Sequence, residues 1–204
     1  SGILALMLAT AREGDYVLVP RNGHRSIFSG LILSGAIPVY LEPQIVPFYE
    51  FASGINFSDF KNKLCSEPAI KSVFVLNPTY YGTVSDLPAL VNESHSRNIP
   101  VIVDEAHGSH FYFNNKFPVG AMACGADAAV QSVHKTGGSL TQSSWFHLQG
   151  DRIDRHRLRD SLSMSQTTSP SYLLMASLDA SRQQLASNGE RIFNRVLELA
   201  WEAR

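Results

Sequence analysis

The sequence has little cysteine, almost no excess charge and no long hydrophobic run. Its 204 residues include two cysteines, Cys65 and Cys124, and no Cys-x-x-Cys motif. This excludes a multi-disulfide framework and the common cysteine-rich zinc sites, and it favours a reducing, cytoplasmic setting. The longest apolar stretches, such as 3–9, are much shorter than a bilayer span. We therefore expect no contact with a membrane.

The charge balance excludes a general attraction to polyanions. Seventeen basic residues stand against eighteen acidic ones, which gives a net charge of -1. The densest basic segment, 152–159, holds four arginines interleaved with Asp151, Asp154 and Asp160. Mixed signs at this spacing are typical of a solvated helix face. We therefore expect no nucleic-acid partner.

Short apolar runs alternate with amphipathic segments along the whole chain. The expected strands are 16–19, 37–41, 72–76, 101–103, 127–131 and 144–148. The expected helices are 3–8, 24–34, 57–64, 85–97 and a last one from 172 onward. Segment 42–54, with Pro43 and Pro47, reads as a loop. This alternation predicts one α/β domain with a mainly parallel sheet and helices on both faces.

Polar residues follow three of the expected strands. These groups are 77–82 (Asn-Pro-Thr-Tyr-Tyr-Gly), 104–107 (Asp-Glu-Ala-His) and 132–135 (Ser-Val-His-Lys). In open parallel sheets, ligands bind beyond the carboxyl ends of the strands. The three groups are therefore expected to converge on one site.

The convergent residues suit one cofactor, pyridoxal 5'-phosphate (PLP). Taken alone, Asp104 is better interpreted as an N-cap of the segment that follows it, and Lys135 as a surface lysine. Together, a lysine can form a Schiff base with an aldehyde, and a buried aspartate can pair with a protonated pyridine nitrogen. Ser132 and His134 could donate hydrogen bonds to a phosphate.

Five ordered segments resemble the major-domain motifs of the bacterial ornithine/lysine/arginine decarboxylases. They are 20–26 (Pro-Arg-Asn-Gly-His-Arg-Ser), 103–108 (Val-Asp-Glu-Ala-His-Gly), 131–136 (Gln-Ser-Val-His-Lys-Thr), 140–144 (Leu-Thr-Gln-Ser-Ser) and 167–172 (Thr-Thr-Ser-Pro-Ser-Tyr). The resemblance spans nearly the whole chain. It implies a PLP-dependent transferase-like fold, that of aspartate aminotransferase. Residues 1–204 would then form a PLP-binding major domain that is truncated at both ends, without its N-terminal phosphate loop and C-terminal domain.

The resemblance implies roles for the residues around the cofactor ring. Lys135 would hold PLP as an internal aldimine, and Asp104 would keep the pyridine nitrogen protonated. His24 would stack on one face of the ring, and Ala106 would pack on the other. His107 would lie close to the ring, near its 3-oxygen.

It also implies contacts to the cofactor phosphate. Ser132 and His134 would bind the phosphate in the same subunit. Thr168, in segment 167–169, would reach the phosphate of a neighbouring subunit. The active unit would therefore be a homodimer or a higher homo-oligomer with shared sites.

The implied reaction is decarboxylation of a basic amino acid. The substrate would displace Lys135 from the cofactor, lose carbon dioxide and leave as an amine. The sequence does not distinguish arginine, lysine and ornithine. An aminotransferase or another PLP lyase of the same fold, and a fragment inactive on its own, remain open alternatives.

Three other motif matches compete with this interpretation. Residues 104–107 spell the DEAH box of a helicase family, but the phosphate-binding loop that this function needs is missing. Segments 58–61, 96–98 and 135–137 imitate penicillin-recognising serine enzymes through short matches that chance explains. His107 and His110, with Asp104, suggest a metal site without a clear third ligand. Glu105 is expected to face away from Asp104, as a solvated or interface carboxylate.

Overall fold

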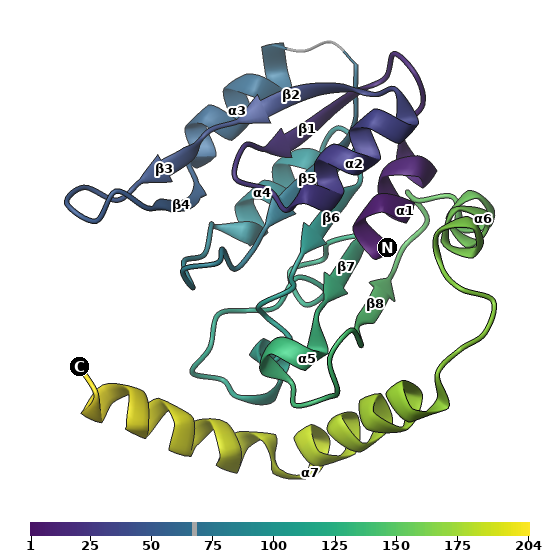
Figure 1. The fold of residues 1–204 in the computed structure, drawn as a ribbon. Helices are drawn as coiled ribbons and strands as arrows, with labels where there is room; N and C mark the ends of the chain where they lie inside the picture. Colours follow the sequence, from purple (N-terminus) through teal and green to yellow (C-terminus); the bar gives the residue numbers. More distant parts are fainter. Residues whose placement is uncertain (67–68) are drawn as a thin grey trace.

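The computed structural model describes residues 1–66 and 69–204, and in these residues six strands form one sheet (Figure 1). The strand order is β2-β1-β5-β6-β7-β8. Their bounds are β1 Tyr16–Pro20, β2 Ile37–Leu41, β5 Ile70–Leu76, β6 Val101–Asp104, β7 Ala128–Gln131 and β8 Trp145–Leu148. All neighbours pair in parallel except β7 and β8, which are antiparallel. The predicted mainly parallel sheet is confirmed.

Helices cover both faces of this sheet. Helices α1 (Gly2–Thr10), α2 (Arg25–Ser34) and α6 (Arg155–Ser165) pack on one face, and α3 (Phe57–Ser66) and α4 (Leu87–His95) pack on the other. Alternate strand residues therefore enter different cores: Phe74 joins the first, whereas Val73 and Val75 join the second. The remaining helical elements are η1 (Phe111–Phe113), α5 (Val133–Thr136) and α7 (Tyr172–Glu202).

Local signals position the helix ends. The Asn56 side chain accepts hydrogen bonds from the amides of Ser58 and Asp59, which caps α3. Gly35 ends α2 with φ of 69°, a left-handed conformation that glycine adopts without steric cost. Both ends agree with the sequence expectation.

A hairpin replaces the loop expected at 42–54. Strands β3 (Pro43–Ile45) and β4 (Ala52–Ile55) pair antiparallel as a separate two-stranded sheet. Pro43 is compatible with this pairing because it is the first residue of an edge strand, where its missing amide donor costs little. The tip places Phe48 and Glu50 in the left-handed region, with φ of 73° and 52°.

The last helix, α7, begins at Tyr172, where the sequence predicts it. Ser181, Leu185, Gly189 and Phe193 are its buried residues. They recur every fourth position and face η1 and the segment after α5, below which α7 runs in Figure 1. Within the described ranges, no helix combines the length and apolarity that membrane crossing requires.

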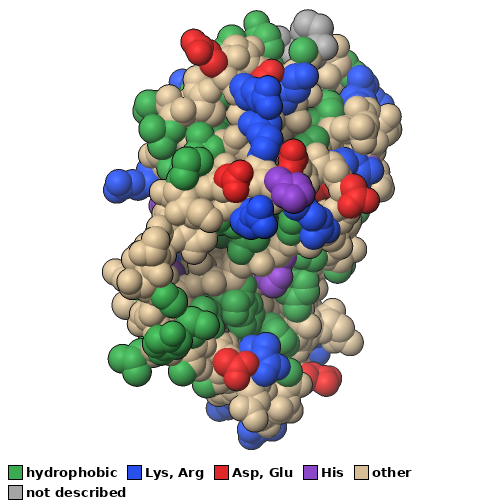
Figure 2. Space-filling view, turned by 90° about the vertical axis from the view of Figure 1, so that its right-hand side faces the viewer, with side chains coloured by type: hydrophobic (Ala, Val, Ile, Leu, Met, Phe, Trp, Pro, Cys, Tyr) green, Lys and Arg blue, Asp and Glu red, His purple; other side chains and the backbone are tan. Residues whose placement is uncertain are grey.

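The arginine-rich segment at α6 makes contacts within the chain. Arg152 pairs with the buried Asp127 at 3.2 Å, and Arg157 donates to the backbone oxygen of Leu8 at 3.0 Å. Asp154 caps α6 through the amides of His156 and Arg157. Figure 2 shows basic and acidic side chains mixed over the upper part of the face that lies at the right of Figure 1. This agrees with the predicted solvated helix face.

Candidate active site

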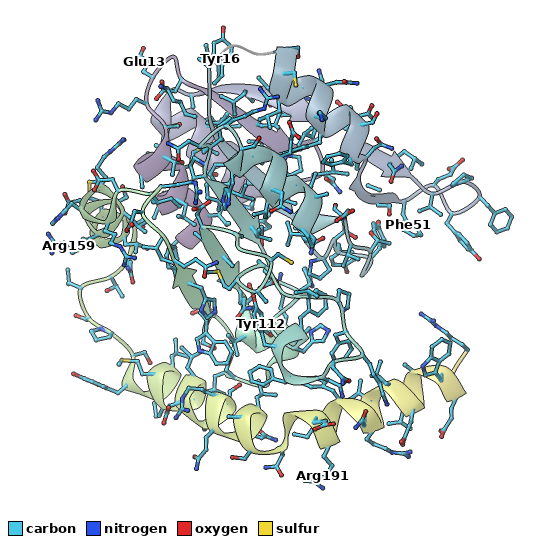
Figure 3. All side chains as sticks on the ribbon, turned by 180° about the vertical axis from the view of Figure 1, so that it is seen from behind. Glu13, Tyr16, Phe51, Tyr112, Arg159 and Arg191 are labelled. Atoms are coloured by element: carbon cyan, nitrogen blue, oxygen red, sulfur yellow. The ribbon has the colours of Figure 1, made fainter. Side chains whose placement is uncertain are left out.

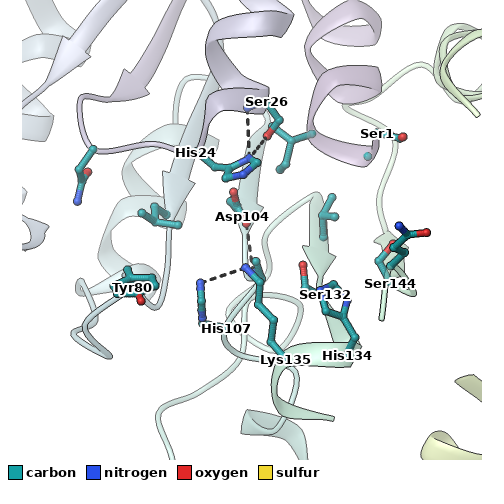
Figure 4. A pocket seen from close by; sticks show the side chains of 17 residues that line it. Ser1, His24, Ser26, Tyr80, Asp104, His107, Ser132, His134, Lys135 and Ser144 are labelled. Carbon is teal, nitrogen blue, oxygen red and sulfur yellow. Dashed lines mark hydrogen bonds between the residues drawn. The ribbon is translucent and has the colours of Figure 1, made fainter. Parts of the chain in front are cut away.

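A cleft of about 530 Å³ lies beyond the carboxyl ends of β1, β5, β6 and β7, beside the first turn of α1. Its volume is in the range of small-molecule sites. The cleft is lined by Ser1, Gly2, Ile3, Asn22, His24, Ser26, Leu76, Tyr80, Asp104, Ala106, His107, Val130, Ser132, His134, Lys135, Gln142 and Ser144. Figure 4 shows the labelled polar side chains directed into this common space. The predicted convergence of three strand ends is therefore observed.

Lys135 reaches the cleft from the short helix α5, which follows β7 directly. Its Nζ lies 3.2 Å from Nε2 of His107. Burial lowers the pKa of His107, and the nearby charges of Lys135 and His24 lower it further. His107 is therefore a neutral acceptor at neutral pH, and Lys135 is the donor.

Asp104 is the last residue of β6, and it is only 5% exposed. Burial raises its pKa, whereas the hydrogen bond from the Ala106 amide to Oδ1, at 3.2 Å, lowers it. The charge of His24, when its ring is protonated, and that of Lys135 act in the same direction as that hydrogen bond. Asp104 is thus a carboxyl group whose ionised form depends on nearby positive charge, so a protonated ring nitrogen would suit it.

His24 is held in place by its role as the N-cap of α2. Its Nδ1 accepts a hydrogen bond from the Ser26 amide at 3.2 Å and lies 2.9 Å from the Ser26 hydroxyl. Because Nδ1 is an acceptor, the neutral ring carries its proton on Nε2. The ring is therefore fixed in orientation at the cleft wall.

Several donors suited to a phosphate gather at the other side of the cleft. His134 donates from Nδ1 to the Ser143 carbonyl at 2.8 Å, so its Nε2 can donate to a phosphate only when the ring carries both protons. Ser132 and Ser144 add hydroxyl groups, and α1 begins at Gly2 with unpaired backbone N–H groups in its first turn. The N-terminus of a helix favours anions.

Seven of the eight predicted site residues line this cleft. They are His24, Asp104, Ala106, His107, Ser132, His134 and Lys135. Thr168 does not line it: it is exposed in the segment between α6 and α7. Its expected contact with a neighbouring subunit stays a prediction.

Other cleft residues were not singled out from the sequence. Tyr80 lies at the mouth, 5.7 Å from His107 between ring centroids. Asn77, from the same polar group, instead accepts from the Ser85 amide and faces away. Gln142 and Ser144 belong to the 140–144 motif, and Asn22 and Ser26 to the 20–26 motif. These motif matches were the available signal.

The geometry separates the two histidines of the suggested metal site. His107 faces the cleft, whereas His110 packs among the rings of Phe111, Phe117 and Phe193. Over residues 1–66 and 69–204, no group of three or more histidine, cysteine or acidic side chains has the geometry of a metal site.

Glu105 is not solvated, which corrects the sequence expectation. Its side chain is 0% exposed and accepts hydrogen bonds from Tyr112, Ala121 and Gln131. The expectation was wrong because these partners become neighbours only in the folded chain.

The donor set of the cleft fits PLP. A primary amine, Lys135, and a buried carboxyl group, Asp104, come from adjacent strand ends, and phosphate donors lie beside them. The same sheet and cleft define the class: a PLP-dependent transferase-like protein of fold type I. The family model described as "Orn/Lys/Arg decarboxylase, major domain" matches residues 1–204. The chain belongs to the Orn/Lys/Arg decarboxylase family.

Three known proteins illustrate the similarity. Arginine decarboxylase of Bacillus subtilis is 42% identical over 202 residues, covering 99% of this chain and 41% of that protein. The structure of the Escherichia coli constitutive lysine decarboxylase has a TM-score of 0.82 at 25% identity, covering 98% of this chain and 30% of that one. A PLP-bound putative aminotransferase from Clostridium difficile 630 has a TM-score of 0.69 at 18% identity, covering 97% and 51%. The chain thus spans about two fifths of the length of the curated relative from Bacillus.

Proposed function

We propose that the protein containing this chain uses PLP to decarboxylate a basic amino acid, releasing an amine and carbon dioxide. The observation that carries the proposal is the presence of both Lys135 and Asp104 in the lining of one cleft of about 530 Å³. Among the three candidate substrates, the name of the 42% identical relative supports arginine. A fold shared with an aminotransferase at 18% identity does not favour transamination.

Each residue of the cleft would have a separate role in holding the cofactor and substrate. Bound PLP would supply an electron sink for the bond that breaks between Cα and the carboxylate. Lys135 would hold the cofactor through Nζ and give way to the substrate amine. Asp104 would keep a proton on the ring nitrogen, and the ring of His24 and the small side chain of Ala106 would fix the plane of the cofactor.

Neighbouring groups would anchor and tune this arrangement. Ser132, His134 and the first turn of α1 would bind the phosphate, which orients the ring relative to the substrate. His107, as a neutral acceptor beside Lys135, would hold Nζ in position through their hydrogen bond.

We also propose that the working enzyme is a homodimer, or a higher homo-oligomer, with shared sites. The exposed Thr168 supports this, since it lies outside its own cleft and is free to reach a second copy. We further propose a cytoplasmic setting, which the low cysteine content of the sequence favours.

Reduction with borohydride tests the cofactor assignment. Full-length enzyme incubated with PLP and then reduced should carry a stable pyridoxyl group on Lys135, found by peptide mapping. Lys135→Ala should lose the label, and Lys116→Ala, a change at an exposed lysine, should keep it. A label that persists in Lys135→Ala would overturn the assignment.

Product analysis tests the reaction. Full-length enzyme should release carbon dioxide and an amine from arginine, and more slowly from lysine or ornithine. Formation of a keto acid instead would show that the protein is an aminotransferase.

A further inference from the structure

Glu105 is a buried carboxyl group outside the cleft. It is 0% exposed, and no basic side chain in the described part of the chain forms an ion pair with it. Three donors surround it: the Ala121 amide at 2.7 Å on Oε1, and Gln131 Nε2 at 2.7 Å and Tyr112 Oη at 2.9 Å on Oε2. Burial of a carboxylate is costly, and neutral donors offset the cost only when all of them are well placed. These three donors therefore form a hydrogen-bond network centred on the Glu105 carboxyl group.

The network ties together the two strands that carry the cofactor residues. Glu105 lies between Asp104 and Ala106, and Gln131 directly precedes Ser132. Their side chains meet at 2.7 Å, and the Glu105 amide donates to the Val130 carbonyl at 3.0 Å. The link therefore fixes the ends of β6 and β7 where their chains turn into the cleft.

The same carboxyl group also holds the segment that follows β6. The Tyr112 hydroxyl donates to Glu105 and accepts from the Met122 amide at 3.1 Å. Figure 3 shows Tyr112 between the end of the sheet and α7. At Gly120, a Cβ atom would lie 2.3 Å from Cζ of Tyr112, so only glycine leaves room for this ring. Both ends of the segment that carries His107 are thus anchored to Glu105.

Gln131 extends the hydrogen-bond network of Glu105 to β8, the edge strand of the sheet. Gln131 Oε1 lies 3.0 Å from Nε2 of His147, a residue of β8. One chain of hydrogen bonds therefore runs across β6, β7 and β8, on the side of Asp104 that faces away from the cofactor cleft.

We propose that Glu105 is a positioning residue of the cofactor site. It sets the distance between the segment holding Asp104 and Ala106 and the segment holding Ser132 and Lys135, without touching the cofactor. This inference rests on the proposed PLP function. Hydrogen-bonded networks of this kind specify one arrangement when every member is satisfied, and misplacement by a fraction of an ångström is enough to weaken a site.

A charge exchange tests the proposal in the full-length enzyme. Glu105→Gln keeps the shape of the side chain but sets its amide N–H₂ against the donors of Tyr112 and Gln131. Gln131→Glu sets a second carboxylate against that of Glu105. The double variant Glu105→Gln/Gln131→Glu restores one amide facing one carboxylate. The readouts are the Kd of the apoenzyme for PLP and the visible circular dichroism per bound cofactor, which reports how the ring is held.

We expect Glu105→Gln to raise the Kd about tenfold or more and to reduce the visible dichroism, as for other misplaced binding groups. The double variant should recover part of both signals, because it restores the contact between positions 105 and 131 but not the one that Tyr112 donates. Tyr112→Phe, which removes one donor and keeps the ring, provides a milder variant if Glu105→Gln does not fold. It should raise the Kd in the same direction by about threefold, because it removes the hydrogen bond to Glu105 and the one from the Met122 amide.

Asp127 supplies a matched control at the opposite end of β7. It is also buried and also has three donors: Val101 N at 2.8 Å, His95 Nε2 at 2.8 Å and Arg152 Nη1 at 3.2 Å. Asp127→Asn should destabilise the apoenzyme while leaving the Kd of the folded fraction and the dichroism unchanged.

Each outcome bears on the proposal. A Glu105→Gln enzyme with the wild-type Kd and dichroism would overturn it, as would losses that only follow the folded fraction, in the manner of Asp127→Asn. If wild-type enzyme fails to bind PLP, both the proposed function and this inference fall. If the wild type binds and only the Glu105 effect is missing, the proposed function stands without this inference.

Discussion

Nζ of Lys135 and Nε2 of His107 lie 3.2 Å apart, within hydrogen-bonding distance of each other. Burial is the first cause that lowers the pKa of His107, and the charge of Lys135 is the second. Lys135→Met should therefore raise the pKa of His107, and it should stay below 6.5 because the burial remains. NMR titration of the imidazole in the apoprotein measures this, with Lys116→Met as the control. An unchanged pKa in Lys135→Met would contradict the pairing.

The Asp104 carboxyl group should lower the unfolding free energy of the apoprotein. Asp104→Asn should therefore stabilise it. Its pKa is raised on folding, so the cost is present at neutral pH and disappears below the unfolded value of 3.8, where the carboxyl group is protonated in both states. We expect Asp104→Asn to gain about 0.5–2 kcal/mol at pH 7, as is typical when a functional site is relaxed. Its affinity for PLP should fall at the same time.

Denaturation of the apoprotein at several pH values, with PLP titration beside it, checks this pair of effects. An Asp104→Asn protein that is less stable than the wild type at pH 7 would show that the carboxyl group serves the fold instead of the cofactor.

His110 should make folding stability depend on pH. Its Nδ1 is buried without a hydrogen-bond partner among those described, and burial lowers its pKa to about 4. As the pH falls from about 6.5, the unfolded chain takes up a proton before the folded one does. Stability should therefore fall from about pH 6.5 to pH 4 and then level off.

His110→Phe isolates this contribution, because phenylalanine suits the cage of Phe111, Phe117 and Phe193. The difference in unfolding free energy between variant and wild type, from urea curves, should grow over this pH range. Ile32→Ala, at an exposed position on α2 without a titratable group, should give a curve parallel to the wild type. Parallel curves for His110→Phe would disprove the linkage.

Gly30 should be required where α2 crosses α1. A Cβ atom there would lie 2.8 Å from Cβ of Met7. Gly30→Ala should destabilise the protein by about 1–3 kcal/mol, the usual cost of overpacking. Ser1 and Gly2, at the start of α1, line the cleft. A shift of α1 should therefore also weaken phosphate binding.

Thermal melting and phosphate titration of Gly30→Ala measure both effects. Ile32→Ala, at an 81% exposed position of the same helix, should differ from wild type by less than about 0.5 kcal/mol. Equal melting temperatures for Gly30→Ala and Ile32→Ala would contradict the prediction, because α1 and α2 would then move apart to accept the added methyl group without loss of stability.

Much of the sheet could be predicted from the sequence because its strands are short apolar runs that end at polar groups. Residues 101–103 show this most clearly, since the run is wholly apolar and is followed by Asp104. The cleft followed from the same logic, because parallel strands bring their carboxyl ends to one edge. Family resemblance then gave particular roles to residues such as His24, whose place near Asp104 no local pattern predicts.

Features that depend on distant partners could not be predicted. The burial of Glu105 requires Tyr112 and Gln131, and the β3–β4 hairpin depends on pairing that outweighs two prolines. The antiparallel direction of β8 is likewise invisible in its four residues, which read as a strand of either direction.

The parallel pairing of β1 with β5 has a consequence for how the protein folds. Leu18 pairs with Val73, and the intervening chain includes β2, which lies on the other side of β1. Pairings of such long sequence separation are slow to form. His24 meets Asp104 and Lys135 only after this step, so the complete cleft requires the assembled sheet. In a refolding experiment, the gain of cofactor binding should therefore track the slowest chain-pairing event, and should lag behind helix formation.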